Sequence, residues 1–278
     1  MNIKTVSISE DVEGVLRQAK LEGNNLTLQG TLDRSMYSKV NKILELIGFK
    51  WNKKAGCHVG QGDSADKLLE GLGGGKVVNE KQTYQFFETP ADVAARMVSL
   101  AEIVPGHRVL EPSAGKGAII KVVERDCPGL ACIDACELNP QMASDLAIRA
   151  EANRKASPIE VNVSCGDFLQ VNQKYDRIVM NPPFTQGQDI EHVRHAYKLL
   201  LPGGRLVAIT SVSWMGGTAK KVKAFREWYE ELQEQGFANP PDELDSGTFK
   251  PSGTGVPTLM IMMLKPKDKD HPINKGKA

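Results

Sequence analysis

The feature that most constrains this chain is a regular alternation of short apolar runs with amphipathic helical patterns between residues 89 and 264. The apolar runs predict strands at 107–111, 131–137, 159–163, 176–180, 205–210 and 258–264. Helical spacing of apolar residues lies between them at 118–125, 140–154, 189–201 and 218–235. Strands separated by helices in this way are typical of a parallel sheet covered by helices on both faces. We therefore predict an α/β fold with a doubly wound, mostly parallel, seven-stranded sheet.

The residues before this region follow another pattern. Alternation at 25–29 and at 56–59 predicts two strands, and apolar spacing at 37–47 predicts a helix. These elements predict a small α+β domain over residues 1–70. Four glycines between Glu70 and Lys76 predict a linker over 71–82, because glycine loses the most conformational entropy on ordering. The α/β domain would then cover 83–265, followed by a polar, mobile tail over 266–278.

Positive charge is concentrated in the middle of the small domain. The stretch from residue 34 to residue 54 holds six basic residues against one acidic residue, Glu45, and Trp51 stands between lysines. Basic residues interleaved with an aromatic residue are typical of surfaces that hold a nucleic-acid backbone, so Lys53 and Lys54 are candidate DNA contacts. The same pattern also fits a solvated charged face with Trp51 in the core of the domain.

Composition limits the class of protein. The chain has 278 residues, 35 basic against 34 acidic, and 41% of its residues are hydrophobic, which excludes disordered and fibrous proteins. It has no run of apolar residues long enough to span a membrane, and its first residues lack the apolar stretch of a secretory signal. We expect a cytoplasmic protein without a membrane partner. With a net charge of +1, only the local distribution of charge bears on nucleic-acid binding.

Cysteines and histidines do not complete a metal site. The five cysteines are an odd number and are expected to be reduced thiols. Cys132 and Cys136 share one face of a predicted strand, and His192 and His195 share one side of a predicted helix, but neither pair has the rest of a four-ligand site. We expect buried thiols, exposed histidines and no metal.

A glycine-containing loop, from Glu111 to Gly117, follows the first strand of the α/β region directly. Gly115 and Gly117 let a ligand approach the backbone, and Glu111 can bind a positively charged group. A phosphate-binding P-loop requires glycine in place of Leu110 and a hydroxyl residue in place of Gly117. A dinucleotide motif requires a third glycine where Ile120 stands. The loop therefore predicts a cationic or zwitterionic ligand.

Acidic residues also end the next two predicted strands. Glu137 stands where sheets of this kind bind ribose hydroxyl groups. Asp167 is placed to accept a hydrogen bond from an adenine amino group, and Phe168 to pack against the ring. Three acids at successive strand ends predict a site for a nucleoside.

The fourth strand ends in Asn181-Pro-Pro-Phe184. Here the sequence resembles the class I S-adenosylmethionine-dependent methyltransferases with a Rossmann-like fold. Within them it resembles the adenine-N6 DNA methyltransferases, whose motif is Asn/Asp-Pro-Pro-Tyr/Phe/Trp. The resemblance spans residues 83–264 and includes Phe86-Phe-Glu-Thr-Pro90 and Leu201-Pro-Gly-Gly-Arg205. The order of the motifs is similar to the gamma arrangement, and the loop at 247–255 is similar to one in small phage and plasmid enzymes.

The resemblance implies roles for particular residues. The cofactor S-adenosylmethionine would be held by Thr89, Glu111, Ser113, Ala114, Gly115, Gly117, Glu137, Leu138, Asp167 and Phe168. On the substrate side, Trp214 and Phe249 would contact the target base; the alternatives are a core position for Trp214 and loop packing for Phe249.

The Asn-Pro-Pro-Phe motif also has a chemical rationale. The exocyclic nitrogen of adenine is a poor nucleophile because its lone pair is delocalised into the ring. The Asn181 side-chain oxygen and the Pro182 carbonyl can accept its two hydrogens, while Pro182 and Pro183 restrict the backbone. Phe184 can stack on a base extruded from the helix. The alternative is a rigid turn after a strand.

We therefore predict a DNA adenine-N6 methyltransferase that acts on a flipped-out adenine in double-stranded DNA, in restriction-modification or in phage or plasmid DNA modification. The alternatives are the same chemistry on an RNA base or a protein glutamine, and a non-catalytic protein that binds the cofactor or DNA. Gamma-type enzymes usually carry a large target-recognition domain after the catalytic region. Without one here, we expect sequence recognition from the N-terminal domain, from loops at 185–189 or 214–218, or from a partner protein.

Overall fold

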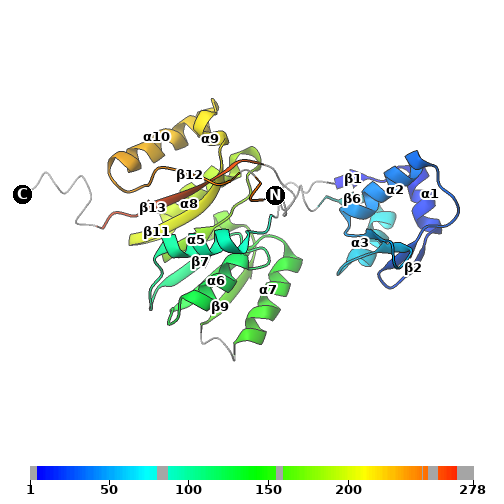
Figure 1. Cartoon of the computed structure of the whole chain (residues 1–278), viewed down its shortest axis with the longest axis horizontal. Coiled ribbons are helices and arrows are strands. Elements are labelled where there is room, and N and C mark those ends of the chain that lie inside the picture. The colour runs from blue at the N-terminus through cyan, green and yellow to red at the C-terminus, as the bar shows by residue number, and fades with distance from the viewer. Residues whose placement is uncertain (1–4, 80–86, 155–158, 246, 250–255, 268–278) are drawn as a thin grey trace, which may run out of the picture. The chain divides into compact units, whose positions relative to one another are not determined.

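The chain divides into two compact units, Met1–Gln85 and Phe86–Ala278, called here the N-terminal and C-terminal units (Figure 1). The computed structural model describes residues 5–79, 87–154, 159–245, 247–249 and 256–267. Most of the tail predicted to be mobile, from residue 268 onward, lies outside the described residues, as do residues 250–255 of the glycine-containing loop.

The N-terminal unit is built on an antiparallel sheet with the strand order β2-β3-β5-β4, and on a separate β1-β6 pair. The strands are β1 (Thr5–Ser7), β2 (Lys20–Glu22), β3 (Asn25–Thr27), β4 (Lys50–Asn52), β5 (Cys57–Val59) and β6 (Lys76–Val78). The helices are α1 (Glu10–Gln18), α2 (Arg34–Leu46) and α3 (Ser64–Gly74). Their apolar faces meet in one core, which includes Leu16, Leu26, Val40, Leu44 and Phe49.

The predicted glycine-rich linker is wrong for residues 71–78. Gly71, Gly73 and Gly74 belong to the last turns of α3, and residues 76–78 form β6, which pairs with β1. A Cβ atom on Gly71 would lie 2.6 Å from Val77 Cγ1, so glycine here lets the helix approach the strand. The glycines therefore serve close packing, which a composition argument cannot distinguish from flexibility. Residues 80–82 of the predicted linker lie outside the described residues.

The C-terminal unit contains the predicted seven-stranded sheet, in the order β12-β13-β11-β10-β7-β8-β9. The strands are β7 (Arg108–Glu111), β8 (Cys132–Glu137), β9 (Val161–Cys165), β10 (Tyr175–Met180), β11 (Leu200–Ser211), β12 (Asp242–Glu243) and β13 (Thr258–Leu264). Five neighbouring strands are parallel, whereas β13 runs antiparallel to β11 and β12 antiparallel to β13. The prediction of a doubly wound α/β fold is confirmed. Only the short β12 had no predicted counterpart.

Helices cover both faces of this sheet (Figure 1). On one face pack α5 (Ala91–Ala101), α6 (Ala118–Asp126) and α7 (Pro140–Asn153). On the other face pack α8 (Gln188–Leu199), α9 (Ser213–Gly216) and α10 (Lys220–Glu234). The strand β10 contributes to both cores, since Val179 faces the first set and Ile178 the second. Among the residues described, no helix is both long enough and apolar enough to cross a membrane.

Candidate functional site

The site lies where the strand order of the C-terminal sheet reverses. From β7 the chain crosses to β8 and β9 on one side, while β10 pairs with β7 on the other. In open α/β sheets, ligands bind beyond the carboxyl ends of the strands at such a point. Glu111, Glu137 and Asn181 end β7, β8 and β10 or follow directly, and Asp167 follows β9. The topology therefore brings these four residues to the side of the sheet where the parallel strands have their carboxyl ends.

Asn181 is anchored by two contacts that hold its side-chain amide. Its Nδ2 donates to the Phe87 carbonyl oxygen at 3.2 Å and to Thr89 Oγ1 at 3.1 Å. Because an amide nitrogen has only two hydrogens, both are used here, and Oδ1 is left as an acceptor. The partners are 94 and 92 residues away in the chain, so sequence spacing did not indicate them.

Thr89 precedes the helix α5 but does not cap it. The helix α5 begins at Ala91 with Pro90 as its N-cap, and no side chain caps it. The buried Thr89 hydroxyl instead accepts from Asn181. This contact links the segment before α5 to the Asn-Pro-Pro-Phe motif.

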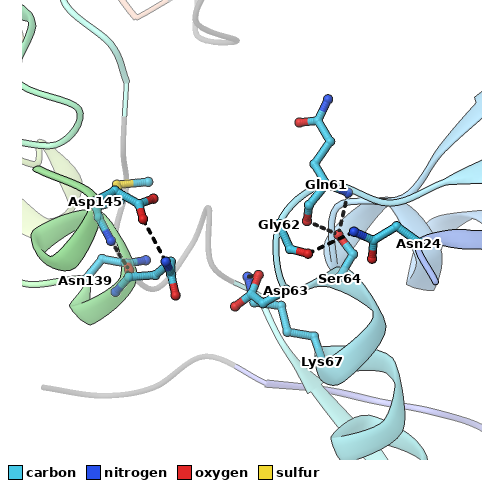
Figure 2. Close-up of polar contacts among 10 residues, drawn as sticks. Asn24, Gln61, Gly62, Asp63, Ser64, Lys67, Asn139 and Asp145 are labelled. Carbon is cyan, nitrogen blue, oxygen red and sulfur yellow. Dashed lines mark hydrogen bonds and ion pairs between the residues drawn. The ribbon is translucent and has the colours of Figure 1, made fainter. Parts of the chain in front are cut away.

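Glu137 ties the glycine-containing loop to the start of α7. Its two carboxylate oxygens accept from the Gly115 N–H and the Asn139 N–H, each at 2.7 Å. The Asn139 side chain in turn caps α7 by accepting from the N–H groups of Gln141 and Met142. Figure 2 labels Asn139 at the start of that helix. Each carboxylate oxygen keeps a further lone pair, so Glu137 can still accept hydrogen bonds from a ligand.

Glu111 is a buried acid with a single described hydrogen bond, from the Ile120 N–H at 3.1 Å. Burial raises its pKa well above the ordinary value, and the nearby carboxylate of Glu137 adds to this, while the Ile120 N–H and Arg149 act in the opposite direction. A carboxylate in this position is stabilised by a neighbouring positive charge. The environment of Glu111 therefore suits a cationic ligand.

The glycine-containing loop depends on left-handed backbone at two positions, with φ of 51° at Gly115 and 71° at Gly117. It is closed by hydrogen bonds from the Ala114 N–H to the Cys136 carbonyl and from the Gly117 N–H to the Ala114 carbonyl. Ala114 is buried, and Ser113 beside it is half-buried. At Gly117 a Cβ atom would lie 2.7 Å from Leu146 Cδ1 on α7.

We expect Gly117→Ala to lower the free energy of unfolding by about 1–2 kcal/mol for the left-handed backbone alone, with a further loss from the contact with Leu146. Chemical denaturation measures this change. Gly166→Ala is the matched control, since Gly166 lacks positive φ and a Cβ there would have nothing within 4 Å. Equal stability of the two variants would contradict this account of the loop.

The predicted stacking of Phe168 on a ligand ring is wrong. Its side chain is 3% exposed and packs edge-on against His192 and His195, with ring centroids 5.3 and 4.9 Å apart. His192 is also buried rather than exposed, and burial lowers its pKa to about 4. Asp167 remains exposed and accepts from the Leu169 N–H at 3.0 Å. Asp167 therefore stays available to a ligand, and the ring of Phe168 does not.

Trp214 and Phe249 do not offer their rings to a target base. Trp214 is 3% exposed, donates from Nε1 to Thr210 Oγ1 at 3.0 Å and contacts the Phe225 ring, so the core alternative holds. Phe249 is 2% exposed and packs in the same core as Met260. Burial of a large aromatic ring contributes more free energy than burial of a smaller side chain, which accounts for the core positions of both residues.

The other residues of the motif are more accessible. Phe184 is partly buried and packs against the core on the face of the sheet that α5, α6 and α7 cover. Pro182 is buried, and Pro183 is half-buried. Leu138, beside Glu137, is half-buried.

A buried acid that follows the Asn-Pro-Pro-Phe motif in the chain was not predicted from the sequence. Asp189, at 1% exposure, accepts from the Ser211 N–H at 2.9 Å and from Ser211 Oγ at 2.8 Å. Ser211 Oγ also lies 2.6 Å from Ser213 Oγ. Burial raises the pKa of Asp189. These contacts join the start of α8 to the end of β11. In the sequence, Asp189 looks like any acid in a first helical turn.

The fold is an α/β domain of the methyltransferase type, with polar residues gathered beyond the carboxyl ends of its strands. The model of the methyltransferase small domain matches residues 85–238, more than half of the chain. The protein therefore belongs to this family, within the class I S-adenosylmethionine-dependent methyltransferases. Among proteins of curated function, none matches significantly.

Solved structures share the fold at low sequence identity. One is a modification subunit ascribed to a type I restriction enzyme of Vibrio vulnificus, 15% identical, with a TM-score of 0.52, covering 87% of this chain and 56% of that one. Another, from Pyrococcus horikoshii and ascribed to the RNA methyltransferases, is 18% identical, with a TM-score of 0.49, covering 66% and 88%. A Plasmodium falciparum dimethyladenosine transferase is 14% identical, with a TM-score of 0.49, covering 69% and 67%.

The residues at the strand ends fit the cofactor of this family. The buried carboxylate of Glu111 suits a positive charge, and Glu137 can accept from hydroxyl groups while it holds the loop at Gly115. Within the described segments, no cluster of three or more His, Cys, Asp or Glu side chains could hold a metal ion.

Proposed function

We propose that this methyltransferase acts on the exocyclic N6 amino group of adenine in DNA. The observation that carries the proposal is the anchoring of the Asn181 amide. Phe87 and Thr89 occupy its Nδ2, so its Oδ1 remains as a hydrogen-bond acceptor. An amide held in this way can accept a hydrogen bond from the amino group of a substrate.

In this proposal the chain supplies position and hydrogen-bond acceptors. Asn181 Oδ1 and the Pro182 carbonyl accept the two hydrogens of the amino group, which makes its lone pair available. No strong base is required, because the amine becomes acidic only once it carries the extra methyl group and loses its proton late. Phe184, at the margin of the core, stacks on an adenine flipped out of double-stranded DNA.

S-adenosylmethionine supplies the methyl group when bound. Glu111 and the loop from Ser113 to Gly117 would hold its methionine part, with Thr89 at one side. Glu137, with Leu138, would bind the ribose, and the exposed Asp167 the adenine amino group. Thr89 then has two tasks, since its hydroxyl also holds Asn181.

DNA is favoured over the alternative substrates by the motif set as a whole. Glu111-Pro112 stands directly before the glycine-containing loop, and Asn181-Pro-Pro-Phe184 follows it, an order that resembles the adenine-N6 DNA enzymes. Sequence selection in this proposal comes from the loops at 185–189 or 214–218, or from a separate specificity protein.

The proposal is tested by incubating the protein with a methyl-labelled cofactor and separate pools of double-stranded DNA, RNA and protein. We expect label in DNA, and N6-methyl-2'-deoxyadenosine as the labelled nucleoside after digestion. The Asn181→Ala variant is the control for contaminating activity. Label that enters RNA or protein in preference to DNA would replace the substrate, and label at another DNA base would contradict the target atom.

A further inference from the structure

An exposed tryptophan stands on the outer strand of the N-terminal sheet. Trp51 is the middle residue of β4, which pairs with β5 only. Its side chain is 53% exposed, so the interpretation that placed it in the core is wrong. A large aromatic ring on an open strand edge carries a cost in solubility and invites pairing with other chains. This position therefore calls for a function.

The ring of Trp51 is supported from one side by a buried histidine. His58, its register partner on β5, is fully buried, and the two ring centroids lie 5.2 Å apart at 70°. His58 Nε2 lies 3.1 Å from Asn41 Oδ1 on α2, and burial lowers the pKa of His58. Tyr37, itself 37% exposed, has its centroid 6.0 Å from that of His58. Trp51 and Tyr37 thus both contact a buried, hydrogen-bonded ring while remaining open to solvent.

Positive charge without a partner gathers around Trp51. Lys50, Lys53 and Lys54 line, together with Trp51, a groove of about 440 Å³. Within the described part of the chain, none of these three lysines forms an ion pair, whereas Lys20, Lys39 and Lys67 of the same unit each pair with an acid.

We call this groove the β4 groove. Hydrogen bonds to the backbone fix the turns that border it. Asn52 Oδ1 accepts from the N–H groups of Lys54 and Ala55, which fixes the turn that carries Lys53 and Lys54. Gln61 also lines the groove, and Ser64 holds its backbone, while Figure 2 shows its side-chain amide pointing away from Ser64. The groove thus presents one aromatic face, three cations and one amide on a rigid frame.

We propose that the N-terminal unit binds single-stranded nucleic acid in the β4 groove, with a base stacked on Trp51 and phosphates beside Lys50, Lys53 and Lys54. Aromatic rings interleaved with cations are the features by which proteins hold single strands without reading their sequence. A duplex is disfavoured because its base faces are already stacked on one another. Lysines alone would serve to block pairing at a strand edge, but that role does not require an exposed tryptophan. This binding is additional to methyl transfer.

The contribution of Trp51 is tested on the full chain by fluorescence anisotropy with a labelled 15-residue oligothymidylate. This probe contains no adenine for the catalytic site. We expect Trp51→Ala to weaken binding by about 5- to 150-fold, the range for loss of one base–aromatic stack. Trp51→Phe, which keeps a ring, should stay within about threefold of the wild type. Because Trp51 is more than half exposed, both variants should keep the melting temperature of the wild type.

The charges are tested by a matched pair of double variants. Lys50→Gln with Lys53→Gln removes two cations from the groove, and Lys20→Gln with Lys76→Gln removes two cations of the same unit that do not line it. Lys20 begins β2, at the opposite edge of the sheet from β4, where Lys50 stands first. We expect the first variant to reduce the slope of log K against log salt by about 1.4, and the second to leave it unchanged.

Several results would overturn the proposal. Binding unaffected by Trp51→Ala would remove the stacking site, and a duplex bound more tightly than the single strand would contradict the preference. Displacement of the oligonucleotide by polyglutamate but not by unlabelled single strand would assign the groove to an acidic peptide instead. Asn181→Ala should bind the oligothymidylate as the wild type does, so failure of the catalytic proposal remains distinguishable from failure of this one.

Discussion

Asn181→Ala is expected to reduce the rate of methyl transfer by roughly 10²–10³-fold, the loss seen when one hydrogen-bonding group that stabilises a transition state is removed. The alanine cannot accept a hydrogen from the target amino group. The variant should still bind S-adenosylmethionine within about threefold of the wild type, because the proposed cofactor residues other than Thr89 lie on β7 and β8 or in the loops after β7, β8 and β9. Single-turnover methylation and calorimetric titration of the cofactor measure the two effects.

Two further variants sharpen this prediction. Asn172→Ala, at an exposed asparagine whose described hydrogen bond is local, should leave the methylation rate unchanged. Thr89→Val removes one of the two acceptors that hold Asn181 Nδ2 and leaves the Phe87 carbonyl, so we expect an intermediate loss of about tenfold. Near-normal methylation by Asn181→Ala would refute the role given to Asn181.

Glu137→Gln is expected to weaken S-adenosylmethionine binding by about 10- to 100-fold. A glutamine amide has one oxygen, so it can accept from the Gly115 N–H or from the Asn139 N–H but not from both. Its NH2 group then faces a backbone N–H, so two donors oppose each other. The glycine-containing loop and the start of α7 are no longer held by the same side chain. The ribose also loses an ionised hydrogen-bond acceptor. Calorimetric titration gives the dissociation constant.

The control for this variant is Glu160→Gln, an exposed acid that precedes β9 at the opposite end of the strands. It removes the same charge and should bind the cofactor as the wild type does. A comparable loss of affinity in both variants would indicate a general electrostatic effect. Unchanged affinity in Glu137→Gln would exclude Glu137 from the cofactor site.

The order of the elements in the C-terminal unit was predictable because the pattern is local. A buried parallel strand must be apolar over its length, and a helix that covers a sheet must repeat its apolar residues every three or four positions. Both patterns are visible in any short window of this chain. In the N-terminal unit the strands have three residues each, too few for alternation to stand out, and β1, β2, β4 and β6 were not predicted.

Aromatic residues that follow the strands were the least predictable part of the site. Phe168, Trp214 and Phe249 were expected to contact a ligand, and the structure buries all three rings in the cores beside the sheet. For Trp51 the sequence allowed a core position, and the structure leaves its side chain exposed. An apolar ring gains free energy from any apolar surroundings, so its identity does not reveal which face of the fold will cover it.

The sequence by itself determined the class of fold, the strand ends at which polar residues gather and the chemical identity of the motif, because each depends on residues near one another in the chain. Tertiary structure alone decided how those residues are held. Asn181 is oriented by Phe87 and Thr89, and the Gly115 loop by Glu137, through hydrogen bonds that exist only once distant strands pair. The direction of an amide or carboxylate is a property of its partners, and no local pattern records which partners folding will supply.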